Sequence, residues 1–170
     1  MELRIEKRGE MVITGLAIRV SCENGANQRD IPAFWQECHK KGTVGALLRA
    51  KPEDAKMGVM GVCVNDFDDR TKTFTYLVAI ERPTDDKARK ALPRGCTELK
   101  VPPGTWAVFP SRGPLPAAIQ TVWKRIYSEW FPTSGYEHAD SPDLEVYGME
   151  DTQAADYYCE VWLPVTKAGA

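Results

Sequence analysis

IPAFWQEC at residues 31–38 and IQTVWKRI at residues 119–126 carry the same helical pattern, and this repetition decides the fold. In each segment apolar side chains recur at intervals of three and four residues, which is the spacing of one face of an amphipathic helix. Trp35 and Trp123 stand at the same phase of the pattern. The sequence therefore predicts one main helix in each half of the chain.

Segments with the β-branched and alternating pattern of strands flank both helices. They cover residues 2–8, 11–20, 57–65, 74–81, 96–101, 105–111, 144–148 and 157–165. Asp30 is expected to cap a first helix over about 31–41, and the second helix should span 116–130. Each half then has the order strand, strand, helix, strand, strand. We predict an α+β domain of two similar halves, about 1–82 and 95–167, that arose by structural duplication and bind a small molecule at the seam between them.

Composition limits the functional classes that the chain can belong to. Its 170 residues, 43% of them hydrophobic and 27% charged, fit a single globular domain over 1–170. A net charge of −2 argues against general affinity for nucleic acid or anionic membranes. The five cysteines form no CxxC pair, so neither a metal site nor a redox motif is expected. With no secretion signal and no spanning segment, we expect a cytoplasmic protein without a cofactor.

Two carboxylates near the C-terminus are the main candidates for a site. Alternation along each strand places Glu145 with Tyr147, and Glu160 with Tyr158 and Trp162. We expect both glutamates on the sheet face that points away from the helices. That face is either a solvated surface or an aromatic pocket with an acidic floor, and the pattern leaves both open. A pocket of this kind suits a flat cation.

Ordered motifs along the chain resemble the gyrase-inhibitor-like, or AraC-type, effector-binding domain family. The second half carries TWAVFPSRGPL (105–115), IQTVWKRIYSEWFPTSGYEHADSPDLEVY (119–147) and CEVWLPV (159–165), while IPAFWQEC (31–38) and YLVAIE (76–81) match the first half. The match covers nearly the whole chain. The chain is similar to the free-standing bacterial members of this family, among them integron cassette proteins of the cationic drug-binding type. The resemblance implies a duplicated βαββ fold with pseudo-twofold symmetry, in which antiparallel sheets curve around a central hydrophobic ligand cleft at the pseudo-twofold axis.

The resemblance also implies buried glutamates in that cleft, surrounded by aromatic side chains. They correspond to Glu145 and Glu160, and the aromatic residue after the second corresponds to Trp162. The other candidate ligand-binding residues are Tyr147, Tyr76, Trp106, Tyr158 and Trp35. For Trp35 and Trp123, helical phase favours the core over the cleft. No catalytic residue is assigned.

These expectations combine into a stand-alone protein that binds hydrophobic, cationic organic compounds, as in multidrug recognition. Strand-like residues begin at Leu3, so no helix-turn-helix module and no direct nucleic-acid contact are expected. One alternative is a hydrolase of strained natural products that uses the carboxylates as general acid and base. Another is a regulator with a protein partner, or a homodimer. His138, beside Asp143, is expected to order its loop rather than to bind a metal.

Overall fold

The structure, a computed structural model, describes residues 1–55 and 57–169. Its strands are β1 (Arg4–Arg8), β2 (Met11–Ser21), β3 (Val59–Cys63), β4 (Thr73–Glu81), β5 (Thr97–Val101), β6 (Gly104–Arg112), β7 (Tyr136–His138), β8 (Asp143–Tyr147) and β9 (Tyr158–Lys167). They form one antiparallel sheet in the order β1-β6-β9-β8-β3-β4-β2-β5, and β7 pairs with the end of β9. The predicted α+β class is confirmed.

The helices are longer and more divided than the sequence predicted. They are α1 (Ala26–Lys40), α2 (Thr43–Ala50), α3 (Asp86–Lys90), α4 (Ala117–Arg125), a π-helical turn (Ile126–Trp130) and α5 (Phe131–Ser134). Asp30 does not cap α1, because Gly25 adopts a left-handed conformation, with φ of 70°, and starts the helix earlier. Helices α2, α3 and α5 and the short strand β7 were not predicted from the sequence. The predicted helix over 116–130 is α4 followed by the π turn.

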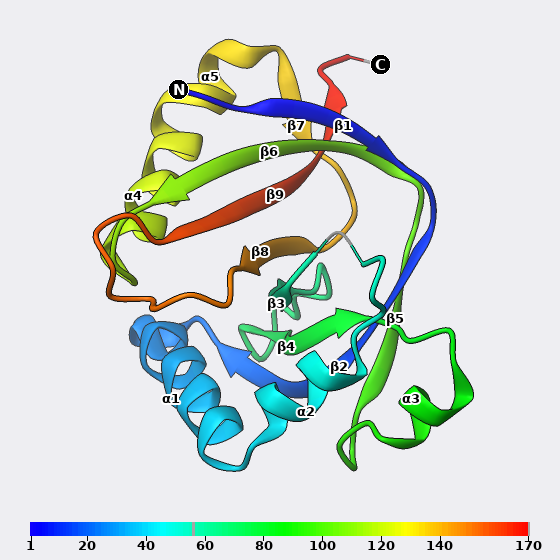
Figure 1. Ribbon diagram of the computed structural model, residues 1–170. Helices are drawn as coiled ribbons and strands as arrows, with labels where there is room; N and C mark the ends of the chain where they lie inside the picture. Colours follow the sequence, from blue (N-terminus) through cyan, green and yellow to red (C-terminus); the bar gives the residue numbers. More distant parts are fainter. Residues whose placement is uncertain (56, 170) are drawn as a thin grey trace.

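A long two-stranded ribbon closes the sheet. The pairing of β1 with β6 reaches Arg8 and Gly104, and the pairing of β2 with β5 resumes without a shift at Met11 and Val101. The two segments of the ribbon, β1–β2 and β5–β6, therefore pass from one end of the sheet to the other, along the right side of Figure 1. Each strand of the central order β6-β9-β8-β3-β4-β2 has a counterpart in the other half: β2 corresponds to β6, β3 to β8 and β4 to β9. When every strand is replaced by its counterpart, the same order is obtained, read from the other end. A duplication would give this order, and the duplication itself stays a prediction.

The helices cover one face of the sheet in two groups. Side chains of α1 and α2 pack with those of β2, β3 and β4, whereas α4 and the π turn pack with β6 and β9. Tyr147 of β8 contacts both groups and therefore lies at the boundary between the halves. In Figure 1, α1 and α4 lie on the same side of the molecule.

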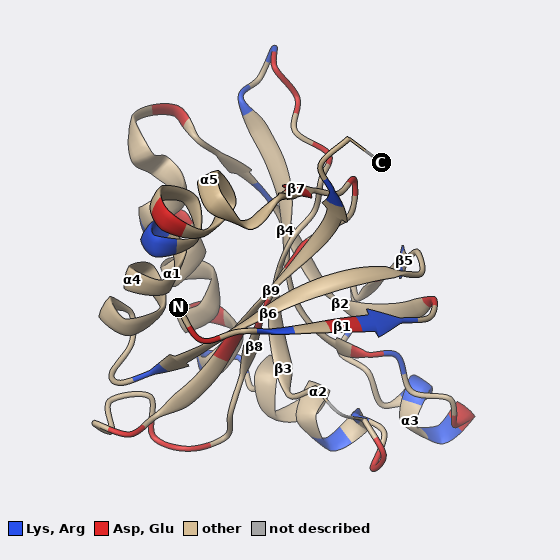
Figure 2. Cartoon of the chain, turned by 90° about the horizontal axis from the view of Figure 1, so that it is seen from above, with Lys and Arg blue, Asp and Glu red and all other residues tan. Residues whose placement is uncertain are grey.

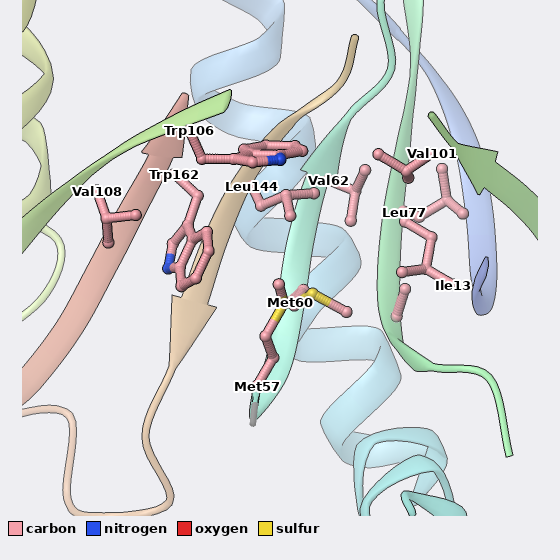
Figure 3. Close-up of a cluster of buried hydrophobic side chains, with 11 residues drawn as sticks. Ile13, Met57, Met60, Val62, Leu77, Val101, Trp106, Val108, Leu144 and Trp162 are labelled. Atoms are coloured by element: carbon pink, nitrogen blue, oxygen red, sulfur yellow. The ribbon is translucent and has the colours of Figure 1, made fainter. Parts of the chain in front are cut away.

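The opposite face holds a separate core, which the curved sheet surrounds. Trp106 and Trp162 belong to it together with aliphatic and methionine side chains (Figure 3). Their rings meet edge to face, with centroids 6.3 Å apart. The sheet thus separates two apolar regions, and the region that a strand residue enters depends on its register.

Charged residues of both signs are spread over the surface. They alternate along β1, and in the view of Figure 2 neither sign occupies a face alone. Across the part of the chain that the structure describes, no helix has the length and apolar character needed to cross a membrane.

Candidate functional site

Strand register places the two candidate glutamates on opposite faces of the sheet. Glu145 of β8 lies opposite Val161 of β9, and Val146 lies opposite Glu160. Residues directly opposite each other in an antiparallel pair point to the same side. Glu145 therefore points toward the helices and Glu160 points away from them. The expectation of one face with two carboxylates is wrong, because alternation orders the side chains within a strand but does not fix the register between strands.

Glu145 lies under the second helix and accepts two short hydrogen bonds. Trp123 of α4 donates its indole N–H to Oε1 at 2.7 Å, and the Tyr147 hydroxyl donates to Oε2 at 2.6 Å. Burial raises the pKa of Glu145, and these two bonds offset only part of that effect. Among the described residues no Lys, Arg or His forms an ion pair with this carboxylate. Glu145 is thus a partly buried acid held by neutral donors.

The first half of the chain contributes the other wall of this site. Trp35 of α1 donates its indole N–H to the hydroxyl of Tyr76 on β4 at 2.8 Å. The ring of Trp35 also meets that of Tyr147 edge to face, with centroids 5.2 Å apart. A Cβ atom at Gly61 would lie 2.2 Å from Tyr76 Oη and 3.3 Å from Glu145 Oε2. The missing side chain at Gly61 therefore lets the hydroxyl and the carboxylate approach each other on the surface of the sheet.

Glu160 has a similar set of donors but also a cation. Arg4 of β1 binds both carboxylate oxygens, at 2.6 and 3.0 Å. The Tyr158 hydroxyl and the Trp162 indole donate to the same carboxylate at 2.5 and 2.8 Å. Burial alone would raise the pKa of Glu160, but the bonds from Arg4, Tyr158 and Trp162 outweigh it and hold the pKa below its usual range. The guanidinium of Arg4 also lies 5.4 Å from the centre of the Trp162 ring.

The structure thus divides the residues that the sequence nominated. One group, on the helix-covered face, consists of Glu145, Tyr147, Tyr76 and Trp35. A second group, on the opposite face, consists of Glu160, Tyr158, Trp162 and Trp106. Trp106 is 1% exposed and packs among apolar side chains, so it is a core residue, although its indole nitrogen has no hydrogen-bond partner among the described residues.

Three residues of the helix-covered site were not predicted from the sequence as binding residues. Trp123 was interpreted as core from its helical phase, yet its N–H reaches the carboxylate. Tyr127 stacks on Trp123 with an interplanar angle of 12°, and it is 56% exposed. Gly61 faces Glu145 across the β3–β8 pairing. Two features of the sequence could have indicated these residues. Trp123 and Tyr127 are four residues apart on a helix, and Gly61 lies within an apolar strand.

Aromatic side chains occupy much of the boundary between the helices. Glu145, Tyr147, Trp35 and Trp123 each remain only partly accessible. Two surface hollows of about 280 and 310 Å³ lie elsewhere, one between α2 and α3 and the other at the bend between β1 and β2.

His138 behaves as a loop-ordering residue. Its Nε2 lies 2.5 Å from Oδ1 of Asp143, at the start of β8. The hydrogen bond to Asp143 raises the pKa of His138 more than burial lowers it. This pair holds the loop between β7 and β8.

Comparison with known proteins agrees with the architecture. Among solved structures, the chain is similar to SAV2435 bound to tetraphenylphosphonium, with a TM-score of 0.82 and 20% identity over 98% of this chain and 94% of that one. It is also similar to an integron cassette protein from the mobile metagenome of Vibrio cholerae, with a TM-score of 0.67 and 17% identity over 96% of this chain and 95% of that one. At such identities the likeness shows a shared fold.

The sequence comparisons identify the family. A segment of 46 residues is 35% identical to a DNA gyrase inhibitor of Erwinia billingiae (strain Eb661), covering 27% of this chain and 30% of that relative. The model of the family described as integron-associated effector binding protein matches residues 4–165. These findings confirm the resemblance predicted from the motifs. Because that family model matches nearly the whole chain, the chain belongs to the integron-associated effector binding protein family.

Proposed function

We propose that the chain binds hydrophobic organic cations at Glu145, between aromatic side chains contributed by both halves. Trp35, Tyr76 and Gly61 come from the pseudo-repeat at 1–82, and Trp123 and Glu145 come from the one at 95–167. One domain over 1–170 would then hold its ligand where the two halves meet. Sites of this kind favour boundaries between structural units.

A comparison of the two glutamates carries this proposal. Each carboxylate accepts a tyrosine hydroxyl and a tryptophan indole N–H, at distances between 2.5 and 2.8 Å. Glu160 is in addition paired with Arg4, and its pKa is lowered. Glu145 has the same neutral donors and a raised pKa. The Glu160 site therefore illustrates, within the same molecule, how such a carboxylate holds a cation.

The surroundings of Glu145 favour a hydrophobic cation over a hydrated one. Tyr147 and Trp123 bind the carboxylate, and the ring of Trp35 packs against Tyr147. Aromatic faces attract cations that have lost their water. A small hydrated ion would lose its hydration shell without gaining apolar contact. An organic cation gains ion pairing and ring contact together. The relative SAV2435, whose structure contains tetraphenylphosphonium, binds a molecule of this class.

Tryptophan fluorescence gives a direct test. Titration with tetraphenylphosphonium should produce saturable quenching, whereas the neutral triphenylphosphine oxide should bind at least tenfold more weakly, since it lacks the charge that Glu145 attracts. Equal affinity for the two compounds would contradict the electrostatic part of the proposal. If tetraphenylphosphonium, rhodamine dyes and acridine dyes all show no saturable binding, the proposed cation site is contradicted.

The same incubations separate the other functions predicted from the sequence. A binding protein returns its ligand unchanged, so mass spectrometry after prolonged incubation should recover the starting compound. Time-dependent conversion would instead support the hydrolase. Copurification with gyrase or a DNA-binding protein, without small-molecule binding, would support the regulator.

A further inference from the structure

Trp123 and Tyr127 connect Glu145 to the protein surface. They lie one turn apart on the same helix, and their rings are nearly parallel, with an interplanar angle of 12° and centroids 6.1 Å apart. The inner ring donates to the carboxylate of Glu145 at 2.7 Å. The outer residue, Tyr127, is 56% exposed. A molecule between the two rings would touch solvent at one edge and the carboxylate at the other.

A flat aromatic guest fits between these rings only if they move apart. Carbon atoms in contact lie about 3.5 Å apart, so a ring sandwiched between two others needs about 7 Å between the planes of those two rings. The planes are no farther apart than the centroids, which are 6.1 Å apart, so the rings must separate by at least about 1 Å. A bulky tetrahedral cation does not fit between parallel rings, because its groups project out of any plane.

The electrostatic environment favours a positive guest in this position. Burial raises the pKa of Tyr127 to about 12, and the negative charge of Asp143 adds to the effect. Asp143 is itself paired with His138, so part of its charge is neutralised. Glu145 lies at the inner end. Aromatic faces above and below a cation attract it through their quadrupoles.

The helix is locally irregular where the outer ring is attached. Tyr127 belongs to the π-helical turn Ile126–Trp130, between α4 and α5. Such turns occur often at functional sites. Ile126 is fully buried in the core and anchors the turn, whereas among the described aromatics the ring of Tyr127 stacks on Trp123 and lies tilted against Phe131. The outer ring can therefore move aside without unpacking the core beneath it.

We propose that Trp123 and Tyr127 form an aromatic clamp that selects planar aromatic cations, of the acridine class, and directs their charge toward Glu145. This inference rests on the proposed function of Glu145 and adds a preference for flat ligands. It also assigns a binding role to Tyr127, which is not among the candidates predicted from the sequence motifs.

The test compares a planar cation, acridine orange, with the tetrahedral cation tetraphenylphosphonium. Tyr127→Ala should weaken acridine orange about tenfold, since one stacking face is lost, while tetraphenylphosphonium changes less than twofold. Phe67→Ala is the matched control, because Phe67 is 47% exposed and contacts Lys72 in a distant turn. This control should leave both affinities unchanged.

The outcomes distinguish the clamp from the site that it serves. If Tyr127→Ala changes neither affinity, or both equally, while Glu145→Gln weakens both cations, the clamp is refuted and the proposed function stands. If neither cation binds the unmodified protein, or Glu145→Gln changes neither affinity, both proposals fail. Thermal unfolding of each variant checks the fold independently, and Tyr127→Ala should unfold within a few degrees of the parent because the side chain is largely exposed.

Discussion

Gly61→Ala provides a stringent test of the geometry around Glu145. The new Cβ would lie 2.2 Å from Tyr76 Oη, 3.1 Å from its Cζ and 3.3 Å from Glu145 Oε2. Ordinary contact begins near 3.4 Å, so the Tyr76 hydroxyl must move by more than about 1 Å. That movement breaks the hydrogen bond from Trp35 and pushes against the carboxylate.

The expected cost follows from these contacts. Overpacking costs about 1–3 kcal/mol, and loss of the Trp35 bond adds about 1 kcal/mol. Lower backbone entropy in the unfolded chain returns about 0.5–1 kcal/mol. The net loss of unfolding free energy is about 1–3 kcal/mol, which lowers the melting temperature of a chain of this size by about 3–10 °C.

Urea denaturation and calorimetry measure this loss, and a second background identifies its cause. Gly9→Ala is the matched control, since no atom lies within 4 Å of its Cβ position. In a Tyr76→Phe background the clashing hydroxyl is gone, so Gly61→Ala should cost at least 1 kcal/mol less there. An equal cost in both backgrounds would refute the contact between Gly61 and the hydroxyl.

Three other predictions follow from the charges. Cation affinity should fall about tenfold per pH unit below the raised pKa of Glu145, because only the ionised form attracts the ligand; flat affinity across that range, measured by fluorescence titration, would contradict this. Arg4→Ala should lower the free energy of unfolding by about 1 kcal/mol at neutral pH. The difference should vanish on acidification, because the lowered pKa of Glu160 contributes stability that is lost as the pH falls through that pKa. A difference in urea denaturation that does not depend on pH would disprove the pairing. The raised pKa of His138 adds stability below its unfolded pKa of about 6.5, which is lost as pH rises through the folded value; Asp143→Asn should remove this dependence from the melting curves, and its persistence would point to another group.

Much of the fold was predictable because it depends on patterns within single elements. Alternation along the last strand places Cys159, Val161 and Leu163 on one face, and these side chains pack with Ile119 and Ile126 of the second helix. The strand positions were close to the observed ones for the same reason. Helix phase and strand alternation are local properties, and local sequence records them.

The division of the site was not predictable, because it depends on contacts between distant segments. Whether Glu145 and Glu160 share a face is decided by the register of β8 against β9. The ion pair between Arg4 and Glu160 joins residues 156 positions apart, so no local pattern could reveal it. The early start of α1 came from the left-handed backbone at Gly25, whereas the sequence predicted a helix that begins after Asp30.

The most direct test of the central claim compares tetraphenylphosphonium binding by Glu145→Gln and Glu160→Gln. Removing a carboxylate about 6 Å from a bound cation should cost about 3 kcal/mol at an effective dielectric of about 20, or about a hundredfold in Kd. The account predicts this loss for Glu145→Gln, whereas Glu160→Gln should bind within about threefold of the parent, because Arg4 already occupies that carboxylate. Unchanged affinity in Glu145→Gln, or a larger loss in Glu160→Gln, would contradict it.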